Sequence, residues 1–530
     1  MAAARLPSAL AGLALLAMAV ALPRDAPAYR HHTSKVRYRE YAQAAFEQAR
    51  RDGKPVFLVI SAVWCYWCKY FDAETLETDD VSSYLNRHFV SVFVDSDLRP
   101  DLTRRYARGW PMTVLFDAEG RVRLAFPGAL RKADMLAVLA RVVEESRRAP
   151  AVAEAPARPS PPTPVTAANH RALLAGHARA LDELADAGRG GWGTGRKFPY
   201  PRLLQYLLER DDLLRDPARR AHVVKTLDAI LRHLWDPVDG GFFRYAERAD
   251  WSEAHTEKLL TVNAGLTLAF HQAGRALRQP RYTQASERAV AWILRVLHDP
   301  LEGGFHGSQS ADPAYYRLAP DRRRAARTPP VNLDKVAAWN AEAILAFLAI
   351  GRATGRPEVL DAAQLSLGFA RRRFVTDRGA YHVHRIATQR GEGRGQLEAN
   401  AWMARAFLEA WRIYRRQSWR DQADALLDYA VAALYDRGSG GFVGARDPDA
   451  PAGTAPDLPA DLNGLMAETL LLAADGAPER RAWREAAAQA AATAGGRLWA
   501  PLVDGEGLTP AALADAAFGL RAWARVVPRG

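Results

Sequence analysis

Cys65 and Cys68 are the only cysteines in the 530-residue chain, and their spacing suits reversible disulfide chemistry. The apolar run at residues 55–61 predicts a buried strand before them, and residues 69–78 can continue as a helix after them. Cys65 then lies at a helix N-terminus, where unpaired backbone N–H groups and the helix dipole favour the thiolate that attacks disulfides. We expect Cys65 to have the lower pKa and the greater exposure, and Cys68 to resolve the mixed disulfide from inside the helix.

A zinc site and an inert structural disulfide are the alternative interpretations of this pair. A structural zinc site needs about four ligands, whereas the chain has no second cysteine pair and His88 is the only nearby histidine downstream. We therefore expect no metal and no cofactor. An inert disulfide stays open as an alternative, because a lone pair in an oxidising compartment survives as a disulfide unless something reduces it.

The first 28 residues have the three parts of a secretory signal peptide. Arg5 precedes an apolar run at residues 10–22, and the small-residue pattern Ala26-Pro27-Ala28 follows it. The run is shorter than the roughly 20 residues that a spanning helix needs. We expect a periplasmic or secreted protein that contacts the membrane only if this segment stays uncleaved.

The charge of the chain favours no nucleic-acid partner. The net charge of +12 arises from 72 Lys+Arg against 60 Asp+Glu, and its basic blocks, residues 322–324 and 371–373, are short. A nucleic-acid surface would need a basic stripe with interleaved aromatic residues or a known module. We interpret the basicity as solvated surface, with the first block in a loop.

The order of predicted elements divides the chain into domains. Helices are expected at residues 38–53, 79–88, 99–106 and 132–147, and strands at 54–61, 89–94, 113–116 and 122–126, which gives an α/β domain at residues 29–148. Residues 149–167 are rich in proline and alanine and predict an extended spacer. Residues 168–530 change to long helices rich in alanine, leucine and arginine.

An internal repeat organises this helical domain. Acidic glycine turns close four helical runs, and each is followed by an asparagine inside the next helix; the turns begin at Asp236, Asp299, Asp377 and Asp436, and the asparagines are Asn263, Asn340, Asn400 and Asn463. Counting about twelve helical runs predicts a closed toroid of six hairpins. The architectural interpretation is that glycines form the turns and buried asparagines tie them; the functional one is that the turns line the mouth of a funnel that binds a carbohydrate.

These motifs together resemble a known family. The chain is similar to the spermatogenesis-associated thioredoxin-domain proteins, which join a thioredoxin-like domain to a six-hairpin glycosidase-like barrel, in the stretches at residues 54–58, 65–68, 88–91, 94–95, 99–101, 109–111, 191–193, 197–199, 239–245, 255–259, 334–335 and 339–340. The resemblance implies two domains, an N-terminal α/β thioredoxin-like fold followed by an all-α (α/α)6 toroid. It also implies that Pro111 is a cis-proline beside the cysteines, and that Trp64 and Pro111 shape a substrate groove.

The chain departs from the family pattern in three places. Tyr66 and Lys69 follow the two cysteines where relatives usually have histidine, so no imidazole is available there. Val59 occupies the position of the buried acid that thioredoxin carries six residues before its first cysteine, so proton transfer needs another group. The acidic segment after the second Gly-Gly-Phe is thinned to residues 308–313.

Three functions remain open from the sequence. The first is an exported thiol–disulfide oxidoreductase that acts on protein thiols or disulfides through Cys65 and Cys68. The second is a carbohydrate-active barrel, an epimerase or a glycosidase, with carboxylate candidates Glu257, Asp334, Glu398 and Asp461, and with His255 beside Glu257 for epimerisation. In the third, the barrel only binds a glycan or a partner protein. The substrate-binding candidates in the barrel are His255, Glu257, Asp334, Trp339 and Asn340.

Overall fold

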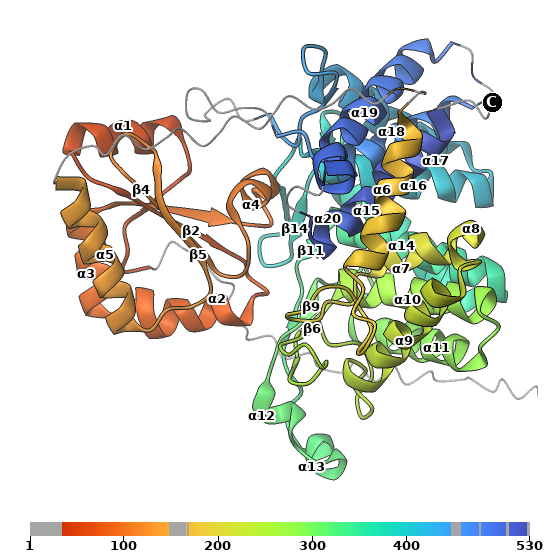
Figure 1. Cartoon of the computed structure of the whole chain (residues 1–530), viewed down its shortest axis with the longest axis horizontal. Helices are drawn as coiled ribbons and strands as arrows, with labels where there is room; N and C mark the ends of the chain where they lie inside the picture. Colours follow the sequence, from red (N-terminus) through yellow and green to blue (C-terminus); the bar gives the residue numbers. More distant parts are fainter. Residues whose placement is uncertain are drawn as a thin grey trace, which may run out of the picture.

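The computed structural model describes residues 34–147, 166, 169–446, 457–475, 477, 479–504 and 508–526. The expected signal peptide and nearly all of the expected spacer lie outside these residues. Figure 1 shows an α/β domain beside a larger helical domain, which confirms the predicted fold class. Within the described residues, no helix is both long enough and apolar enough to cross a membrane.

The α/β domain is built on one mixed sheet whose strands lie in the order β1 (Tyr38–Arg39), β3 (Val90–Asp95), β2 (Val56–Ser61), β4 (Met112–Phe116) and β5 (Val122–Pro127). β1, β3 and β2 run parallel, and β4 runs antiparallel to β2 and to β5. The first helix begins at Gln43 and not at residue 38, because Tyr38 and Arg39 pair with β3 at the sheet edge.

Helices cover both faces of this sheet. α1 (Gln43–Asp52) and α4 (Pro100–Tyr106) pack on one face, and α3 (Asp79–His88) and α5 (Lys132–Arg147) pack on the other. Strand β2 serves both cores because its side chains alternate, with Val56, Leu58 and Ile60 on the first face and Phe57 and Val59 on the second. The helix after the cysteines, α2 (Tyr66–Phe71), continues as a π-helical turn at Asp72–Leu76.

The helical domain is a closed double ring. Its inner helices are α7 (Pro201–Leu208), α10 (Leu260–Ala276), α14 (Ala337–Thr354), α16 (Leu397–Tyr414), α18 (Ala460–Ala474) and α20 (Pro510–Val526). Each inner helix packs on the next, and α20 packs back on α7 to close the ring. The outer helices are α6 (His170–Glu183), α9 (Pro217–His233), α11 (Pro280–Val296), α15 (Pro357–Arg373), α17 (Gln417–Tyr429) and α19 (Arg481–Trp499). The result is the predicted toroid of six hairpins.

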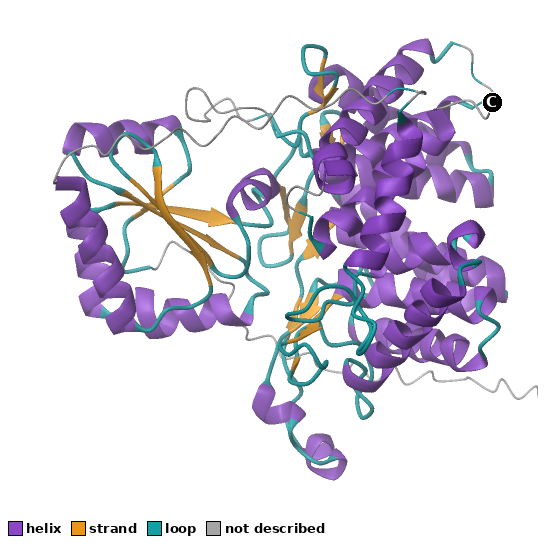
Figure 2. Ribbon diagram, in the orientation of Figure 1, coloured by secondary structure: helices purple, strands orange, loops and turns teal. Residues whose placement is uncertain are grey.

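Short strands lie at the end of the barrel that faces the α/β domain. The connections from outer to inner helices form two three-stranded sheets, β8–β9–β10 and β11–β14–β15, besides several two-stranded ones. Their bounds are β8 (Lys258–Leu259), β9 (Ser308–Gln309), β10 (Val331–Asn332), β11 (Lys335–Val336), β14 (Val383–Arg385) and β15 (Arg390–Glu392). Figure 2 shows these strands between the barrel helices and the α/β domain. The starts of the inner helices therefore face the other domain.

The repeated asparagines are architectural. The Oδ1 atom of Asn340 accepts from the Phe305 N–H at 2.7 Å, and its Nδ2 donates to the carbonyls of Phe305 and Val336 at 3.0 Å each. Asn263 and Asn463 make the same three bonds in their own hairpins. Because an inner-helix amide satisfies both backbone groups of the aromatic residue, it fixes the turn to the helix.

Three buried lysines form a second part of the repeat. Each of them donates to an aspartate carboxylate and to a glycine carbonyl. The sets are Lys258 with Asp236 and Gly240, Lys335 with Asp299 and Gly303, and Lys197 with Asp186 and Gly193; the Lys258–Asp236 distance is 2.8 Å. The chain closes tightly at these turns: Gly241 has φ 81°, and a Cβ on it would lie 2.6 Å from the Trp292 ring.

The first basic block is not wholly solvated loop. Residues 320–325 form helix α13 (Pro320–Ala325), which follows α12 (Pro313–Tyr316) in a lobe that projects from the barrel in Figure 1. Arg322 and Arg324 are exposed, whereas Arg323 is buried and donates to Asp236 at 2.8 Å. Helical spacing turns only this arginine inward, onto the carboxylate that also binds Lys258.

Candidate active site between the two domains

The disulfide lies at the start of α2, where the cysteine spacing predicts it. Cys65 is bonded to Cys68 and is the N-cap residue of α2, with extended backbone at φ −77° and ψ 115°. Its Sγ accepts the Cys68 N–H at 3.1 Å. The Trp110–Pro111 bond is cis, as the resemblance implied. A sulfur that accepts a helix N–H is favoured as a thiolate once the disulfide is reduced.

The expectation of an exposed Cys65 is wrong. Both cysteines are only 2% exposed, and they belong to an apolar cluster that contains Ala62 and Trp64 from their own domain and Leu259 from the barrel. Leu259 ends strand β8 at the barrel mouth. Because the barrel covers the face that carries the disulfide, the N-terminal position of Cys65 in the helix does not make its sulfur more accessible.

Trp64 connects the two domains. Its ring packs edge-on against Trp110 at 5.4 Å and lies tilted against Trp339 of the barrel at 5.9 Å. The Arg244 guanidinium lies 4.8 Å from the ring centre. Its Nε1 donates to Asp97 at 2.9 Å. Trp64 and Trp339, both predicted site residues, are therefore in contact, but they fill the interface rather than line an open groove.

Glu257 reaches the cysteine helix from the barrel. This side chain is fully buried, its Oε2 accepts from Arg244 at 2.8 Å, and its Oε1 lies 3.4 Å from the Tyr66 backbone nitrogen, which donates to it. Burial raises the pKa of Glu257 above its ordinary value, and Arg244 opposes this shift. A barrel carboxylate thus caps the first turn of α2, beside Cys65.

His255 lies next to Glu257 but is not arranged as its acid–base partner. The His255 Nε2 is 3.9 Å from Glu257 Oε2, beyond hydrogen-bond distance, and its ring stacks on Tyr245. Burial, together with Arg244 and Arg196, lowers the pKa of His255 to about 3. This imidazole is therefore neutral at physiological pH.

A carboxylate group at the end of β3 forms another part of the interface. Asp97, buried beside Asp95, accepts from Trp64, and burial together with the Asp95 charge raises the pKa of Asp97 to about 7. Asp95 binds Arg385 of the barrel, and Arg385 also binds Asp334 at 3.0 Å. Asp334 is thus an ion-pair partner at the domain contact rather than a free carboxylate in the barrel.

The other predicted carboxylates meet inside the inner ring. The charges of Glu398 and Asp461 interact, and the charge of Asp515 interacts with that of Asp461. Arg202 lies 2.6 Å from Glu342 and 3.8 Å from Asp461. Arg104 reaches this group from the α/β domain, since it binds Asp457 at 2.9 Å and approaches Glu398 at 3.9 Å. We call these residues the ring cluster: Arg104, Arg202, Glu342, Glu398, Asp461 and Asp515.

The structure thus separates the predicted barrel residues into different environments. Glu257 and Trp339 contact the cysteine segment, and His255 lies beside Glu257. Asp334 forms an ion pair at the interface, and Asn340 is part of the repeat. Sequence reasoning missed Arg104, Arg202, Arg244, Arg385, Glu342 and Asp515. Arg202 follows Lys197 by five positions, the spacing that separates Lys258 from Asn263, but Asn263 binds the turn whereas Arg202 binds Glu342, so the repeat does not predict its contacts.

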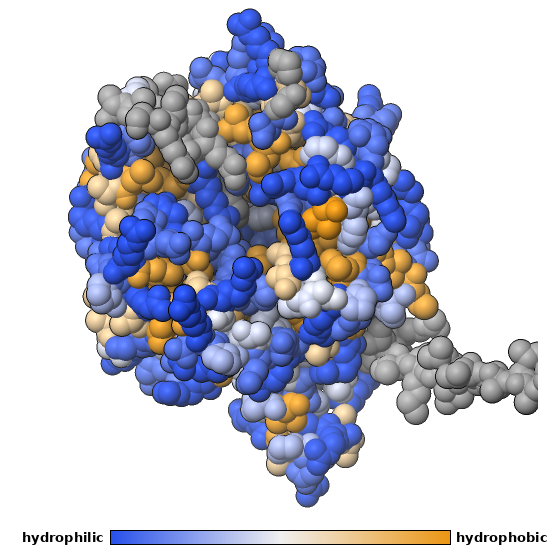
Figure 3. Space-filling model, turned by 90° about the vertical axis from the view of Figure 1, so that its right-hand side faces the viewer, coloured by the Kyte–Doolittle hydropathy of each residue, from blue (hydrophilic) through white to orange (hydrophobic). Residues whose placement is uncertain are grey.

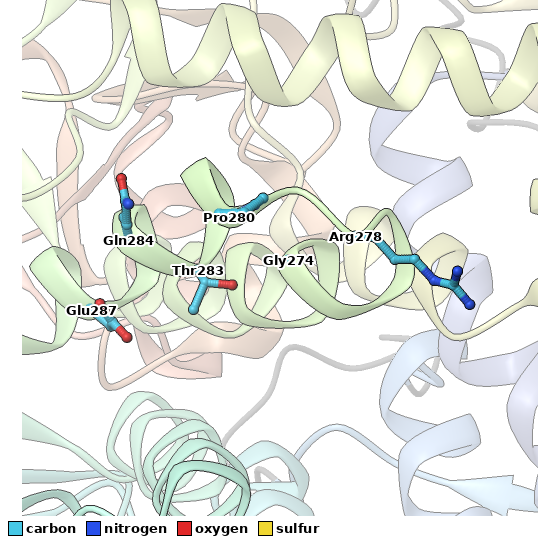
Figure 4. A pocket seen from close by; sticks show the side chains of 6 residues that line it. All are labelled: Gly274, Arg278, Pro280, Thr283, Gln284 and Glu287. Atoms are coloured by element: carbon cyan, nitrogen blue, oxygen red, sulfur yellow. The ribbon is translucent and has the colours of Figure 1, made fainter.

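Pockets also lie on surfaces away from this interface. The pocket in Figure 4 lies where the end of α10 meets the start of α11, opposite the barrel mouth, and is lined by Gly274, Arg278, Pro280, Thr283, Gln284 and Glu287. The face in Figure 3 is mostly hydrophilic, with hydrophobic patches separated from one another. Among the described residues, no group of three or more His, Cys, Asp or Glu could hold a metal ion.

Two solved structures with a similar fold are cellobiose 2-epimerases. The cellobiose 2-epimerase from Spirochaeta thermophila DSM 6192 aligns with a TM-score of 0.50 at 15% identity, covering 68% of this chain and 98% of the epimerase. The cellobiose 2-epimerase from Bacillus thermoamylovorans B4167 aligns with a TM-score of 0.50 at 8% identity, covering 61% and 85%. At these identities the likeness shows the (α/α)6 fold alone.

Comparisons of the sequence find a different group of proteins. The profile Thioredox_DsbH, described as a protein of unknown function, DUF255, matches residues 24–146. Spermatogenesis-associated protein 20 of Homo sapiens is 27% identical over 319 residues, and that of Mus musculus 26% over 313. The chain is thus similar to these spermatogenesis-associated proteins. Each match covers 53% of this chain and 40% of the relative, so the chain spans less than half the length of the relatives that it matches.

Proposed function

We propose that this chain is a thiol–disulfide oxidoreductase in which Cys65 is the nucleophile and Cys68 the resolving thiol. The observation that carries the proposal is the position of the disulfide at the helix start, where Cys65 Sγ accepts the Cys68 N–H at 3.1 Å. The same N–H would stabilise a thiolate on Cys65 after reduction. Cys68 is one turn inside the helix and can attack Cys65 when a mixed disulfide has formed.

Burial of the pair restricts what can react with it. With both sulfurs 2% exposed beneath Leu259 and Trp339, a folded protein client cannot reach Cys65 while the domains are in contact. We propose that small thiols and disulfides react with the closed chain slowly, and that protein thiols or disulfides react when the domains separate.

Trapping tests the assignment of the two cysteines. Cys68→Ser leaves the attacking thiolate without its resolving partner, so the variant should accumulate a mixed disulfide when mixed with oxidised glutathione, and Cys65→Ser should accumulate far less. Mass spectrometry after acid quenching reports the adduct of one glutathione. Equal trapping by both variants, or alkylation of Cys68 ahead of Cys65 in the reduced protein, would reverse the assigned roles.

We also propose that the protein is exported, to the periplasm or outside the cell. The support is the order of Arg5, the apolar run at residues 10–22 and the Ala26-Pro27-Ala28 pattern. Mass measurement of the purified protein should give a chain that begins near Tyr29. A membrane-held chain that retains Met1 would contradict cleavage.

A carbohydrate site in the barrel is the second candidate function, and the ring cluster supports it. Its carboxylates come from the starts of inner helices, and Glu398, Asp461 and Asp515 are partly or fully accessible to solvent. Carboxylates are the groups that glycoside hydrolysis uses in pairs, and the two similar structures above are named as cellobiose 2-epimerases.

Cellobiose is the direct probe of this second function. Calorimetry should detect its binding to the wild type and weaker binding to Asp461→Asn, with turnover to an epimer followed by chromatography. Glu257→Gln should leave sugar binding unchanged, because Glu257 contacts Arg244 and the cysteine helix instead of the ring cluster. Neither binding nor turnover across a panel of sugars would favour a non-catalytic barrel.

A further inference from the structure

Glu257 is a buried charged group of the barrel that contacts the redox helix of the other domain. Its carboxylate lies between Arg244, at 2.8 Å, and the Tyr66 N–H, at 3.4 Å. Tyr66 is the first residue of α2 and directly follows Cys65. The side chain is fully buried, so water screens its charge little.

The α/β domain itself supplies no acid under the disulfide from strand β2. Val59, which stands at the position of the thioredoxin acid, is buried among apolar residues such as Phe57 and Leu115. Asp97 of the same domain contacts the disulfide cluster through Trp64, whose Nε1–H donates to it. The carboxylate that binds the cysteine helix comes from the barrel.

We propose that Glu257 is a positioning residue that sets how strongly the start of α2 stabilises a thiolate on Cys65, and hence the balance between disulfide and dithiol. The inference rests on the proposed oxidoreductase function. The physical reason is competition for the helix N-terminus. A carboxylate that accepts from the first helix N–H reduces the positive potential at this end of the helix, and the same potential stabilises a thiolate on Cys65. Arg244 acts in the opposite direction, since its guanidinium lies 4.8 Å from the Trp64 ring and favours negative charge nearby.

The exchange reaction balances with glutathione disulfide as the oxidant. The Cys65 thiolate attacks one glutathione sulfur, which forms a mixed disulfide and releases the other glutathione as a thiolate that takes up a proton. The Cys68 thiol then loses its proton and attacks Cys65 Sγ, which forms the Cys65–Cys68 bond and releases the second glutathione. The two cysteine sulfurs lose two electrons in total, and the two glutathione sulfurs gain them.

Glu257→Gln tests the proposal because glutamine removes the negative charge but keeps the size of the side chain and one oxygen, which can accept from either Tyr66 or Arg244. Whole chains would be equilibrated with glutathione redox mixtures and, for lower potentials, with dithiothreitol, then acid-quenched and measured by mass spectrometry. We expect the thiol–disulfide equilibrium to move about tenfold towards the dithiol, equal to ~30 mV. Absorbance at 240 nm should show a lower thiol pKa in the reduced variant.

Two further variants make the measurement decisive. Glu253→Gln changes an exposed carboxylate in the same connection, paired with Arg248, and should leave the equilibrium unchanged. Arg244→Met removes the opposing cation and should move the equilibrium towards the disulfide.

An unchanged or oppositely shifted equilibrium in Glu257→Gln, with a wild-type pair that titrates reversibly, would overturn the role of Glu257. A wild-type pair that stays oxidised even in dithiothreitol would overturn the oxidoreductase function itself, and the role of Glu257 with it.

Discussion

Arg385 of the barrel binds Asp95 of the α/β domain, and the same guanidinium binds Asp334 of the barrel at 3.0 Å. Arg104 crosses the interface in the other direction and binds Asp457 at 2.9 Å. These ion pairs are only partly accessible to solvent and lie around the apolar contact between Trp64 and Trp339. They hold the barrel over the disulfide, so the accessibility of Cys65 depends on them.

Arg385→Ala should therefore expose the disulfide. Loss of the cation leaves Asp95 and Asp334 facing each other without their shared partner. Removing one partner of a buried ion pair should weaken the free energy that holds the two domains together by about 3 kcal/mol. We expect dithiothreitol to reduce the Cys65–Cys68 bond at least tenfold faster than in the wild type, measured by quenched-flow alkylation. Arg356→Ala, which removes a local pair with Glu358, is the control and should match the wild type. Equal reduction rates in Arg385→Ala and the wild type would mean that these ion pairs do not keep the barrel over the disulfide.

Asp97→Asn should change how stability depends on pH. Because the folded pKa of Asp97 is raised to about 7 from an ordinary value of about 3.9, the folded chain holds this proton more tightly than the unfolded chain does. The wild type should therefore lose stability relative to Asp97→Asn as pH rises from about 4 to about 7, by no more than about 4 kcal/mol, with no further loss above that window. The asparagine Oδ1 can still accept from Trp64.

Melting temperatures of both proteins across this pH range measure the difference. Subtracting the two curves removes the contribution of all other titrating groups. Parallel curves would show that the carboxylate of Asp97 ionises in the folded chain as it does in the unfolded one.

Asn340→Ala should destabilise the barrel without touching the redox pair. The substitution leaves the buried N–H and carbonyl of Phe305 without partners, which costs about 2–4 kcal/mol. Urea unfolding followed by circular dichroism should show a lower midpoint. Gln417→Ala, at an exposed position of α17, should change the midpoint little. A similar small change in both variants would contradict the architectural role of the repeat.

Arg323→Ala should release the projecting lobe. Arg323 donates to Asp236 and Asp239 and to the Tyr316 carbonyl, so its loss removes the polar anchor of α12 and α13. Limited proteolysis should cut between residues 312 and 330 several-fold faster than in the wild type. Its exposed neighbour provides the matched control: Arg322→Ala removes the same charge from the same helix and should leave the cleavage rate unchanged.

The sequence alone determined features that depend on local pattern. The apolar run at residues 55–61 and the cysteine spacing predicted the strand–disulfide–helix order, because the periodicity of a strand or a helix depends on residues that are close in the sequence. The acidic turns and the asparagines from Asn263 to Asn463 predicted a six-hairpin ring, because each hairpin repeats the same short-range bonds. The edge strand at Tyr38 was missed, since its pairing with β3 is not local.

Only the tertiary structure decided what surrounds the cysteines. Glu257 and Trp339 belong to the other domain and are far from Cys65 in the sequence. They meet the cysteine segment because the surfaces of the two domains are complementary, which a short sequence pattern cannot predict. The same docking buries both sulfurs and divides the predicted carboxylates between the interface and the ring cluster. A helix start can favour a thiolate by its own backbone, but its exposure and the charge beside it depend on the domain packed against it.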